Sequence, residues 1–302
     1  MTDRHAQIEA FLAGAGWPNA RRVPLAGDLS PRRYSLLRGD RGTAILMDAD
    51  TTMEPFARIT AWLRSAGFSA PEIIAGDPEA GLLLLEDLGD VSVNTHLAEA
   101  PDQTESIHSA CVDLLLALRA EAAPVLACPD TDALVAWTEF ADAHYPGVDS
   151  AALAGFRAVL RDLLAEALKE PPAVSLRDFH ADNLMWLPDR EGIRRFGLLD
   201  YQDAFLTHPA YDLVSFLTDA RVEVPRALRQ ATLQAYMDRS NDAEGPFRRA
   251  FSAFSAQRNL RILGIFAYGA RNGRAHHLGK LPRVHGYFAE ALDHPAFDTV
   301  RR

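Results

Sequence analysis

The stretch "LRDFHADNLMW", residues 176–186, decides the fold, because it sets acidic, amide and basic side chains directly before an apolar run. Asp178 and Asn183 stand in a D-x-x-x-x-N pattern. This spacing can hold a general base and a metal ligand on one short turn. The pattern alone is weak evidence, since single Asp residues in loops more often form turns or caps. A second carboxylate is needed to complete such a site.

The second carboxylate ends the segment that follows. The sequence "NLMWLPDREGIRRFGLLD" predicts a hairpin that turns at residues 188–192 and ends at Asp200. Because a hairpin folds back on itself, Asp200 should return close to Asn183. We therefore expect Asp178 to act as the base and Asn183 and Asp200 to bind Mg²⁺. Asp212, in "HPAYDLVSF", is expected to be structural, capping or anchoring the helix that begins there.

The remaining sequence divides into two parts of different character. Three short strands are predicted within residues 21–48, followed by a helix near 54–67 and a second hairpin across 72–87. After "LEDLGD" the pattern becomes helical, with helices predicted at 102–122, 131–145 and 150–169. This order predicts an α+β, protein-kinase-like fold of two lobes. The small β-rich N-lobe would span residues 1–87, and the larger, mostly helical C-lobe residues 88–302.

Composition and charge favour a protein that acts on small molecules. The 302 residues carry 31 Lys and Arg against 41 Asp and Glu, and the resulting net charge of −10 repels nucleic acid and anionic lipid. No window approaches eighteen uninterrupted apolar residues, so neither a membrane span nor an export signal is expected. Cys111 and Cys128 lack the spacing of a disulfide framework. We expect a cytoplasmic monomer.

Several motifs, in order along the chain, resemble the aminoglycoside phosphotransferase and choline kinase superfamily, which shares the protein-kinase-like fold. They are "PLAGDLSPRRY", "LMDAD", "LLLLEDLGD", "LRDFHADNLMWL", "GLLDYQDA", "YDLVSFLTDAR" and "QRNLRILGIF" followed by "LPRV". More closely, they are similar to the bacterial anomeric kinases that phosphorylate N-acetylmuramate and N-acetylglucosamine at C1. The resemblance implies a cell-wall sugar kinase that uses ATP and Mg²⁺, with its catalytic Asp at Asp178 and its metal ligands at Asn183 and Asp200.

The resemblance also implies where the nucleotide binds. ATP would lie between the lobes, its adenine against the backbone of the connecting segment "LEDLGD", residues 85–90, and its phosphates under "GDLSPRRY". The candidate cofactor-binding residues are Ser30, Arg32, Arg33, Glu86 and Leu88.

One departure concerns the lysine that kinases usually carry on the third strand to hold the phosphates. Met47 or Asp48 stands at that place, and the chain has no Lys before Lys169. Either Arg32 or Arg33 supplies the missing charge, or the protein binds nucleotide weakly as a non-catalytic pseudokinase.

The acceptor site is expected on the helical lobe. Its candidate residues are Arg177 and His180 beside the base, and Gln257, Arg258 and Arg261 on a later helix. An Arg fork would suit a sugar carboxylate such as that of N-acetylmuramate, although a surface helix laced by charges is the simpler interpretation for each Arg singly. A kinase for another alcohol, such as an aminoglycoside, choline or homoserine, stays open. An Arg-rich helix, however, suits a cationic acceptor poorly.

Overall fold

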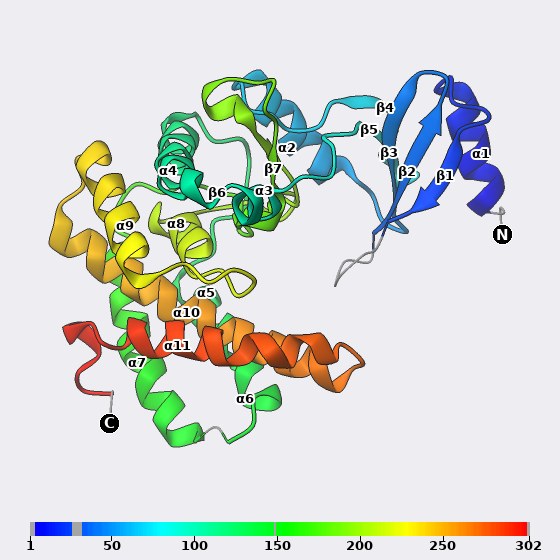
Figure 1. Cartoon of the computed structure of the whole chain (residues 1–302). Helices are drawn as coiled ribbons and strands as arrows, with labels where there is room; N and C mark the ends of the chain where they lie inside the picture. The colour runs from blue at the N-terminus through cyan, green and yellow to red at the C-terminus, as the bar shows by residue number, and fades with distance from the viewer. Residues whose placement is uncertain (1–3, 26–31, 148, 301–302) are drawn as a thin grey trace. The chain divides into compact units, whose positions relative to one another are not determined.

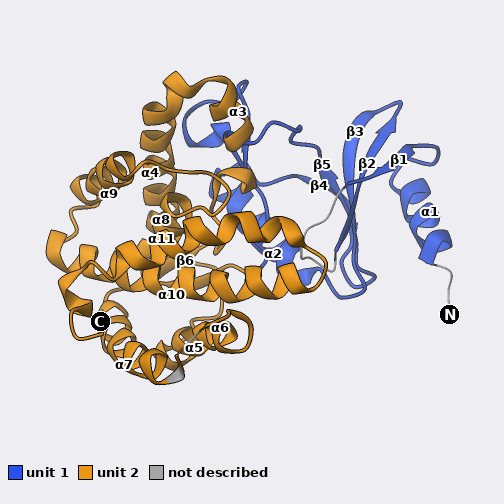
Figure 2. Cartoon of the chain, turned by 60° about the horizontal axis from the view of Figure 1, so that its bottom comes forward, with its two compact units in different colours: residues 1–93, 184–202 blue, residues 94–183, 203–302 orange. Residues whose placement is uncertain are grey.

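The computed structural model describes residues 4–25, 32–147 and 149–300. The chain forms two compact units, one made of residues 1–93 and 184–202 and the other of residues 94–183 and 203–302 (Figure 2). The segment 184–202 therefore belongs to the first unit, although it interrupts the second along the chain. The sequence analysis divided the chain into an N-lobe and a C-lobe after residue 87, and this lobe boundary stays a prediction.

The first unit is built on a five-stranded antiparallel sheet with strand order β1-β2-β3-β5-β4 (Figure 1). Its strands are β1 (Arg21–Pro24), β2 (Arg33–Gly39), β3 (Gly42–Asp48), β4 (Ile73–Asp77) and β5 (Leu82–Glu86). The predicted tight turn at "GDRG" joins β2 to β3, with Gly39 paired to Gly42. Gly42 adopts a φ of 101°, a conformation that Gly reaches without steric cost. The predicted strands and both hairpins of this sheet are confirmed.

Helix α1 (Arg4–Gly14) covers one face of this sheet. Ile8 and Leu12 pack there against Leu37, Leu46 and Leu84. Because neighbouring residues of a strand point to opposite faces, this packing fixes the direction of every side chain on β2 and β3.

Helix α2 (Glu54–Ser65) anchors the chain just after Asp200 within the same unit. The ring of Tyr201 stacks on Phe56 with centroids 5.1 Å apart, and its hydroxyl lies 2.7 Å from the Thr60 hydroxyl oxygen. The predicted hairpin before Asp200 is confirmed as β7 (Leu184–Trp186) paired with β8 (Phe196–Leu198).

The second unit is mostly helical and is organised around the long helix α10 (Glu244–Arg271), which contacts α6, α7, α8 and α11. The other helices are α3 (Val93–Glu99), α4 (Thr104–Ala120), α5 (Thr131–Ala136), α6 (Phe140–His144), α7 (Ser150–Ala167), α8 (Ala210–Leu217), α9 (Arg226–Ser240) and α11 (Leu281–Ala291). A two-stranded sheet joins β6 (Ala173–Ser175) to β9 (Phe205–Thr207). The helix predicted over 131–145 is interrupted by a 3₁₀ turn at Trp137–Glu139. No helix in the described ranges is both long and apolar enough to cross a membrane.

Gly264 allows α10 to approach α6, and its replacement by Ala should destabilise the protein. A Cβ at Gly264 would lie 2.7 Å from the backbone nitrogen of Ala141, a contact that backbone atoms cannot relieve cheaply. We expect Gly264→Ala to cost about 1–3 kcal/mol of unfolding free energy, measured by urea denaturation. Gly245 on the same helix has no atom within 4 Å of its added Cβ. Gly245→Ala should be neutral or slightly stabilising, and equal losses in both variants would contradict this explanation.

Candidate functional site

A buried carboxylate fixes the backbone that leads to Asp178. Asp212 on α8 accepts hydrogen bonds from the Ser175 hydroxyl at 2.7 Å, from the Leu176 backbone N–H at 2.6 Å and from the Arg177 backbone N–H at 3.1 Å. Burial raises the pKa of Asp212 to about 6, and these three donors oppose that rise. The structural role predicted for Asp212 is confirmed in kind. Asp212, however, holds the loop after β6 rather than the start of its own helix.

The loop then turns sharply and presents Asp178. Arg177 has a φ of 72°, which is uncommon for a residue with a side chain and often marks a functional site. The backbone carbonyl of Asp178 accepts hydrogen bonds from the Asn183 side-chain amide at 2.9 Å and from the His180 backbone N–H at 3.0 Å. The D-x-x-x-x-N spacing thus closes one compact turn.

The Asp178 carboxylate is about one-third exposed, and Arg258 on α10 donates to its Oδ1 at 3.4 Å. Burial would raise the pKa of the Asp178 carboxyl, but the nearby charges of Arg258 and Arg177 outweigh it and hold this pKa below its usual value. Asp178 is therefore ionised at neutral pH and can accept a proton.

Three more of the predicted acceptor residues lie around Asp178 in the second unit. Arg177 pairs with Asp203 at 3.1 Å, and Arg261 lies over the Trp137 ring with 5.1 Å to its centroid. Arg177 and Arg261 both lower the pKa of Asp178. Burial lowers the pKa of His180 to about 3, so its ring is neutral at pH 7. The Nδ1 atom of His180 is buried and has no hydrogen-bond partner among the described residues.

Gln257 is the exception. Its side-chain amide is fully buried and donates to the Leu134 carbonyl at 2.8 Å. The side chain therefore fastens α10 to α5, and the structure gives it no place beside Asp178. The sequence grouped Gln257 with Arg258 and Arg261 on one helix face as candidate acceptor ligands, and in the structure both Gln257 and Arg258 are buried inside the unit.

The two predicted metal ligands offer the oxygen chemistry that Mg²⁺ prefers. Asn183 donates its side-chain amide N–H to the Asp178 carbonyl, so its side-chain oxygen is the atom that it could offer to a metal. Asp200 has a φ of 56°, and its Oδ1 accepts from the Gln202 side chain at 2.7 Å. No group of three His, Cys, Asp or Glu side chains suited to a metal occurs in the described ranges. One carboxylate and one amide fit Mg²⁺, which is commonly held by few protein groups together with substrate phosphates.

The strand register decides which side chains share a sheet face near the missing lysine. Arg33 pairs with Asp48 across β2 and β3, and Arg4 of α1 donates to Asp48, so this pair lies on the face that α1 covers. Tyr34 and Met47 are also cross-strand partners, and they occupy the opposite face. Met47 and Asp48, the two residues that stand where the kinase lysine is expected, therefore point to opposite faces of the sheet.

The two candidate arginines differ in their surroundings. Arg33 donates to Asp50 and Asp48 at 2.8–3.2 Å, and these carboxylates raise its pKa further. Burial raises the pKa of Tyr34 to about 12, Arg32 opposes this rise and Asp200 adds to it. Arg32 and Asp200 therefore both act on the Tyr34 hydroxyl.

The remaining predicted nucleotide residues fall at the end of β5 or outside the described chain. Glu86 is the last residue of β5 and pairs with Arg190 of the β7–β8 segment. Leu88 is buried, and a Cβ at Gly197 would lie only 2.8 Å from its Cδ1 atom. Ser30 lies outside the residues that the structure describes.

Two residues of this site were not found from the sequence. The Ser215 hydroxyl accepts from Arg258 at 2.7 Å, and the Arg258 guanidinium lies 5.8 Å from the centroid of the Tyr211 ring. Both residues belong to α8, four positions apart, and so lie on one helix face. The available signal in the sequence was that a tyrosine and a serine stand four positions apart within an otherwise apolar helix.

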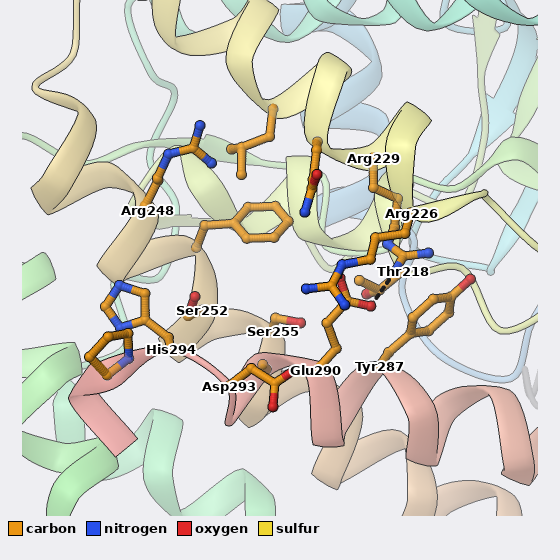
Figure 3. Close-up of a pocket in the computed structure, with 15 residues that line it drawn as sticks. Thr218, Arg226, Arg229, Arg248, Ser252, Ser255, Tyr287, Glu290, Asp293 and His294 are labelled. Carbon is orange, nitrogen blue, oxygen red and sulfur yellow. Dashed lines mark hydrogen bonds and ion pairs between the residues drawn. The ribbon is translucent and has the colours of Figure 1, made fainter. Parts of the chain in front are cut away.

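A separate cavity of about 300 Å³ lies in the second unit, lined by side chains of α9, α10 and α11 (Figure 3). Arg226 and Arg229 enter its lining but pair with Glu290, as the dashed line in Figure 3 shows for one of them. None of the residues predicted for the site contributes to this lining.

Comparisons with known proteins show the family of the chain. A family model described as "phosphotransferase enzyme family" matches residues 21–251. An N-acetylmuramate/N-acetylglucosamine kinase of Caulobacter vibrioides is 33% identical, over 99% of this chain and 95% of its own length. A kinase of the same name from Pseudomonas aeruginosa is 32% identical, over 94% of this chain and 88% of its own.

Solved structures share the fold. A choline/ethanolamine kinase family protein from Mesorhizobium loti superposes with a TM-score of 0.67 at 16% identity, covering 98% of this chain and 99% of its own. An ADP-bound aminoglycoside phosphotransferase, APH(2'')-Ib, gives 0.63 at 12% identity, with coverage of 96% and 99%. The predicted α+β, protein-kinase-like fold is confirmed, as is the resemblance drawn from the sequence motifs.

Proposed function

Because the chain belongs to the phosphotransferase enzyme family, we propose that it transfers the γ-phosphoryl group of ATP to the anomeric hydroxyl of N-acetylmuramate, N-acetylglucosamine or both. The observation that carries the kinase chemistry is the 176–183 loop, in which Asp212 fixes the backbone and Asn183 closes the turn around Asp178. The acceptor class rests on the names of relatives that match nearly the whole chain. A role in recycling cell-wall sugars in the cytoplasm would follow from that acceptor.

The residues divide the work of phosphoryl transfer between them. Asp178, ionised and partly exposed, accepts the proton of the acceptor hydroxyl as its oxygen attacks the γ-phosphorus. Asn183 and Asp200 would hold Mg²⁺, which when bound neutralises charge on the phosphates. The pairing of Leu184 with Leu198 supports a shared ion, because the chain leaves the hairpin at the same end toward Asn183 and toward Asp200.

The acceptor would be recognised by the groups around Asp178. Arg177 and Arg261 are partly accessible cations of the kind that suits the carboxylate of N-acetylmuramate. The neutral ring of His180 lies in the same loop, and its buried Nδ1 has no hydrogen-bond partner among the described residues. Dense acidic or aromatic cages suit choline and aminoglycosides better, and this group of arginines would repel both cations.

A screen of acceptors tests the proposal directly. Release of ADP from Mg·ATP should be followed with N-acetylmuramate, N-acetylglucosamine, choline, homoserine and an aminoglycoside. We expect turnover with at least one of the two amino sugars and none above background with the cationic alcohols. Turnover of choline or the aminoglycoside alone would replace the proposed acceptor. Nucleotide binding without any turnover would support the pseudokinase alternative.

Arg32 rather than Arg33 should supply the charge that kinases usually take from a lysine. Arg33 is held by Asp48 and Asp50, whereas Arg32 and Asp200 both act on Tyr34, which lies on the opposite face of the sheet. We expect Arg32→Ala to raise the KM for ATP roughly 10- to 150-fold, the equivalent of one charge-assisted contact of about 1.5–3 kcal/mol. The KM for the sugar should stay nearly constant.

Arg33→Ala is the matched control, because it removes an adjacent arginine from the other sheet face. Its KM for ATP should stay within about twofold of the parent value, while its thermal stability falls slightly. If both variants keep parental ATP kinetics, no arginine of "SPRRY" replaces the lysine.

A further inference from the structure

Arg258 is a buried arginine in the middle of α10. The whole residue is 5% exposed, and one terminal nitrogen of its guanidinium donates both to the Ser215 hydroxyl and to Oδ1 of Asp178. The ring of Tyr211 lies 5.8 Å from the guanidinium carbon. The sequence made Arg258 a candidate ligand of the sugar, with a charged surface helix as the simpler interpretation, and the structure buries the side chain.

Burying a guanidinium is costly unless hydrogen bonds and an opposite charge compensate it. The Nε of Arg258 is buried without a hydrogen-bond partner among the described residues, so the compensation is incomplete. A hydrophobic side chain of similar length would fill the same space without this cost. The retained charge therefore points to a use beyond stability, and the carboxylate that it reaches is the proposed base.

We propose that Arg258 is the positioning residue of Asp178, holding its carboxylate in the orientation that receives the acceptor proton. This inference rests on the proposed kinase function. The loop contacts from Asp212 and Asn183 fix only the backbone on either side of Asp178, whereas Arg258 binds the carboxylate itself. Arg258 contacts Oδ1, and no described residue donates to Oδ2. Oδ2 is therefore the atom that takes the proton of the acceptor hydroxyl.

Ser215 sets the direction of Arg258 in turn. Its hydroxyl stands on α8, one turn after Tyr211, and the 2.7 Å bond aligns the guanidinium between the two helices. Asp212, which fixes the loop, belongs to the same helix. One face of α8 thus sets both the backbone of Asp178 and, through Arg258, its carboxylate.

A double-mutant cycle separates positioning from sugar binding. Arg258→Met should lower kcat about 10- to 100-fold with ATP and the working acceptor, because a misplaced base costs rate rather than binding, and each KM should stay within about twofold. In the Asp178→Asn background the same change should alter kcat less than about twofold. Additive losses, or a rise confined to the sugar KM, would overturn the proposal.

Two further variants identify the cause of any loss. Arg258→Lys keeps the charge but loses the planar fork, so it should recover part of the kcat lost in Arg258→Met. Arg248→Met makes the same substitution on the same helix at a residue that pairs with Glu244, and it should leave kcat unchanged. A loss in Arg248→Met equal to that in Arg258→Met would assign the effect to α10 as a whole and contradict the proposal.

Unfolding measurements keep this inference separate from the proposed function. If the parent protein phosphorylates none of the acceptors, the proposed function fails, but the Arg258–Asp178 pair can still be measured. The urea midpoint should shift on Arg258→Met in the parent background and shift clearly less in the Asp178→Asn background. An identical shift in both backgrounds would show that the two side chains are not coupled, which would refute the inference.

Discussion

Asp178→Asn should lower kcat by about 10²–10⁴-fold while leaving the affinity for Mg·ATP nearly unchanged. The substitution removes the proton acceptor but keeps the size of the side chain. The backbone carbonyl that binds Asn183 is also unaffected. Steady-state kinetics, with nucleotide affinity measured separately by calorimetry, would check both parts. An anomeric hydroxyl is more acidic than an ordinary alcohol and depends less on a base, so we expect a loss toward the lower end of the range.

Asp200→Asn is the informative comparison for that experiment. A metal ligand contributes to nucleotide binding as well as to turnover, so this variant should weaken Mg²⁺-dependent ATP binding and lower kcat together. Near-normal turnover in Asp178→Asn would show that another group is the base. Unchanged ATP affinity in Asp200→Asn would remove Asp200 from the metal site while leaving the assignment of Asp178 intact.

The largest effect should come from a change in the substrate. The methyl glycoside of the working amino sugar has no free anomeric hydroxyl, so its phosphorylation should fall to background. The glycoside should nevertheless inhibit competitively if the pocket accepts one additional methyl group. An enzyme that phosphorylates C6 would turn over the sugar and its glycoside alike. ADP release with matched concentrations of the two compounds therefore separates the two positions.

Phosphorus NMR of the product gives an independent answer. A phosphate coupled to the anomeric proton, lost on mild acid treatment, is expected for a glycosyl phosphate. Coupling to the C6 methylene protons would overturn the proposed position of transfer and leave the kinase assignment standing. An authentic sample of the amino sugar 1-phosphate is the control, because it shows whether the coupling to the anomeric proton can be resolved.

Local patterns in the sequence were sufficient to predict most of the elements. The turn at Gly42, the strands β2 and β3 and the hairpin β7–β8 were predicted because alternation and turn residues act over a few positions. The helix predicted over 131–145 was wrong in its middle, where the chain forms a 3₁₀ turn at Trp137–Glu139. The helical periodicity of apolar residues does not reveal such a short change from α-helix to 3₁₀ turn.

The candidate site could be predicted in part. The five-residue spacing of Asp178 and Asn183 is a local property, and the structure confirms that the two residues close one turn. The contacts of the Gln257 side chain could not be predicted from neighbouring residues, because its helix is buried on several sides and the periodicity of the helix does not show which side faces solvent. Its contact with Leu134 joins residues that are 123 positions apart in the chain.

The sequence by itself determined the order of strands and helices along the chain and the spacing of Asp178 and Asn183, because both depend on neighbouring residues, and it showed directly that no lysine precedes Lys169. Only the tertiary structure decided that Arg33 faces Asp48 and that Arg258 reaches Asp178, two contacts that join residues 15 and 80 positions apart. The physical reason is that an arginine's role depends on the carboxylate it meets. That partner is brought to it by the packing of separate elements, such as α10 against α8, which no local pattern encodes.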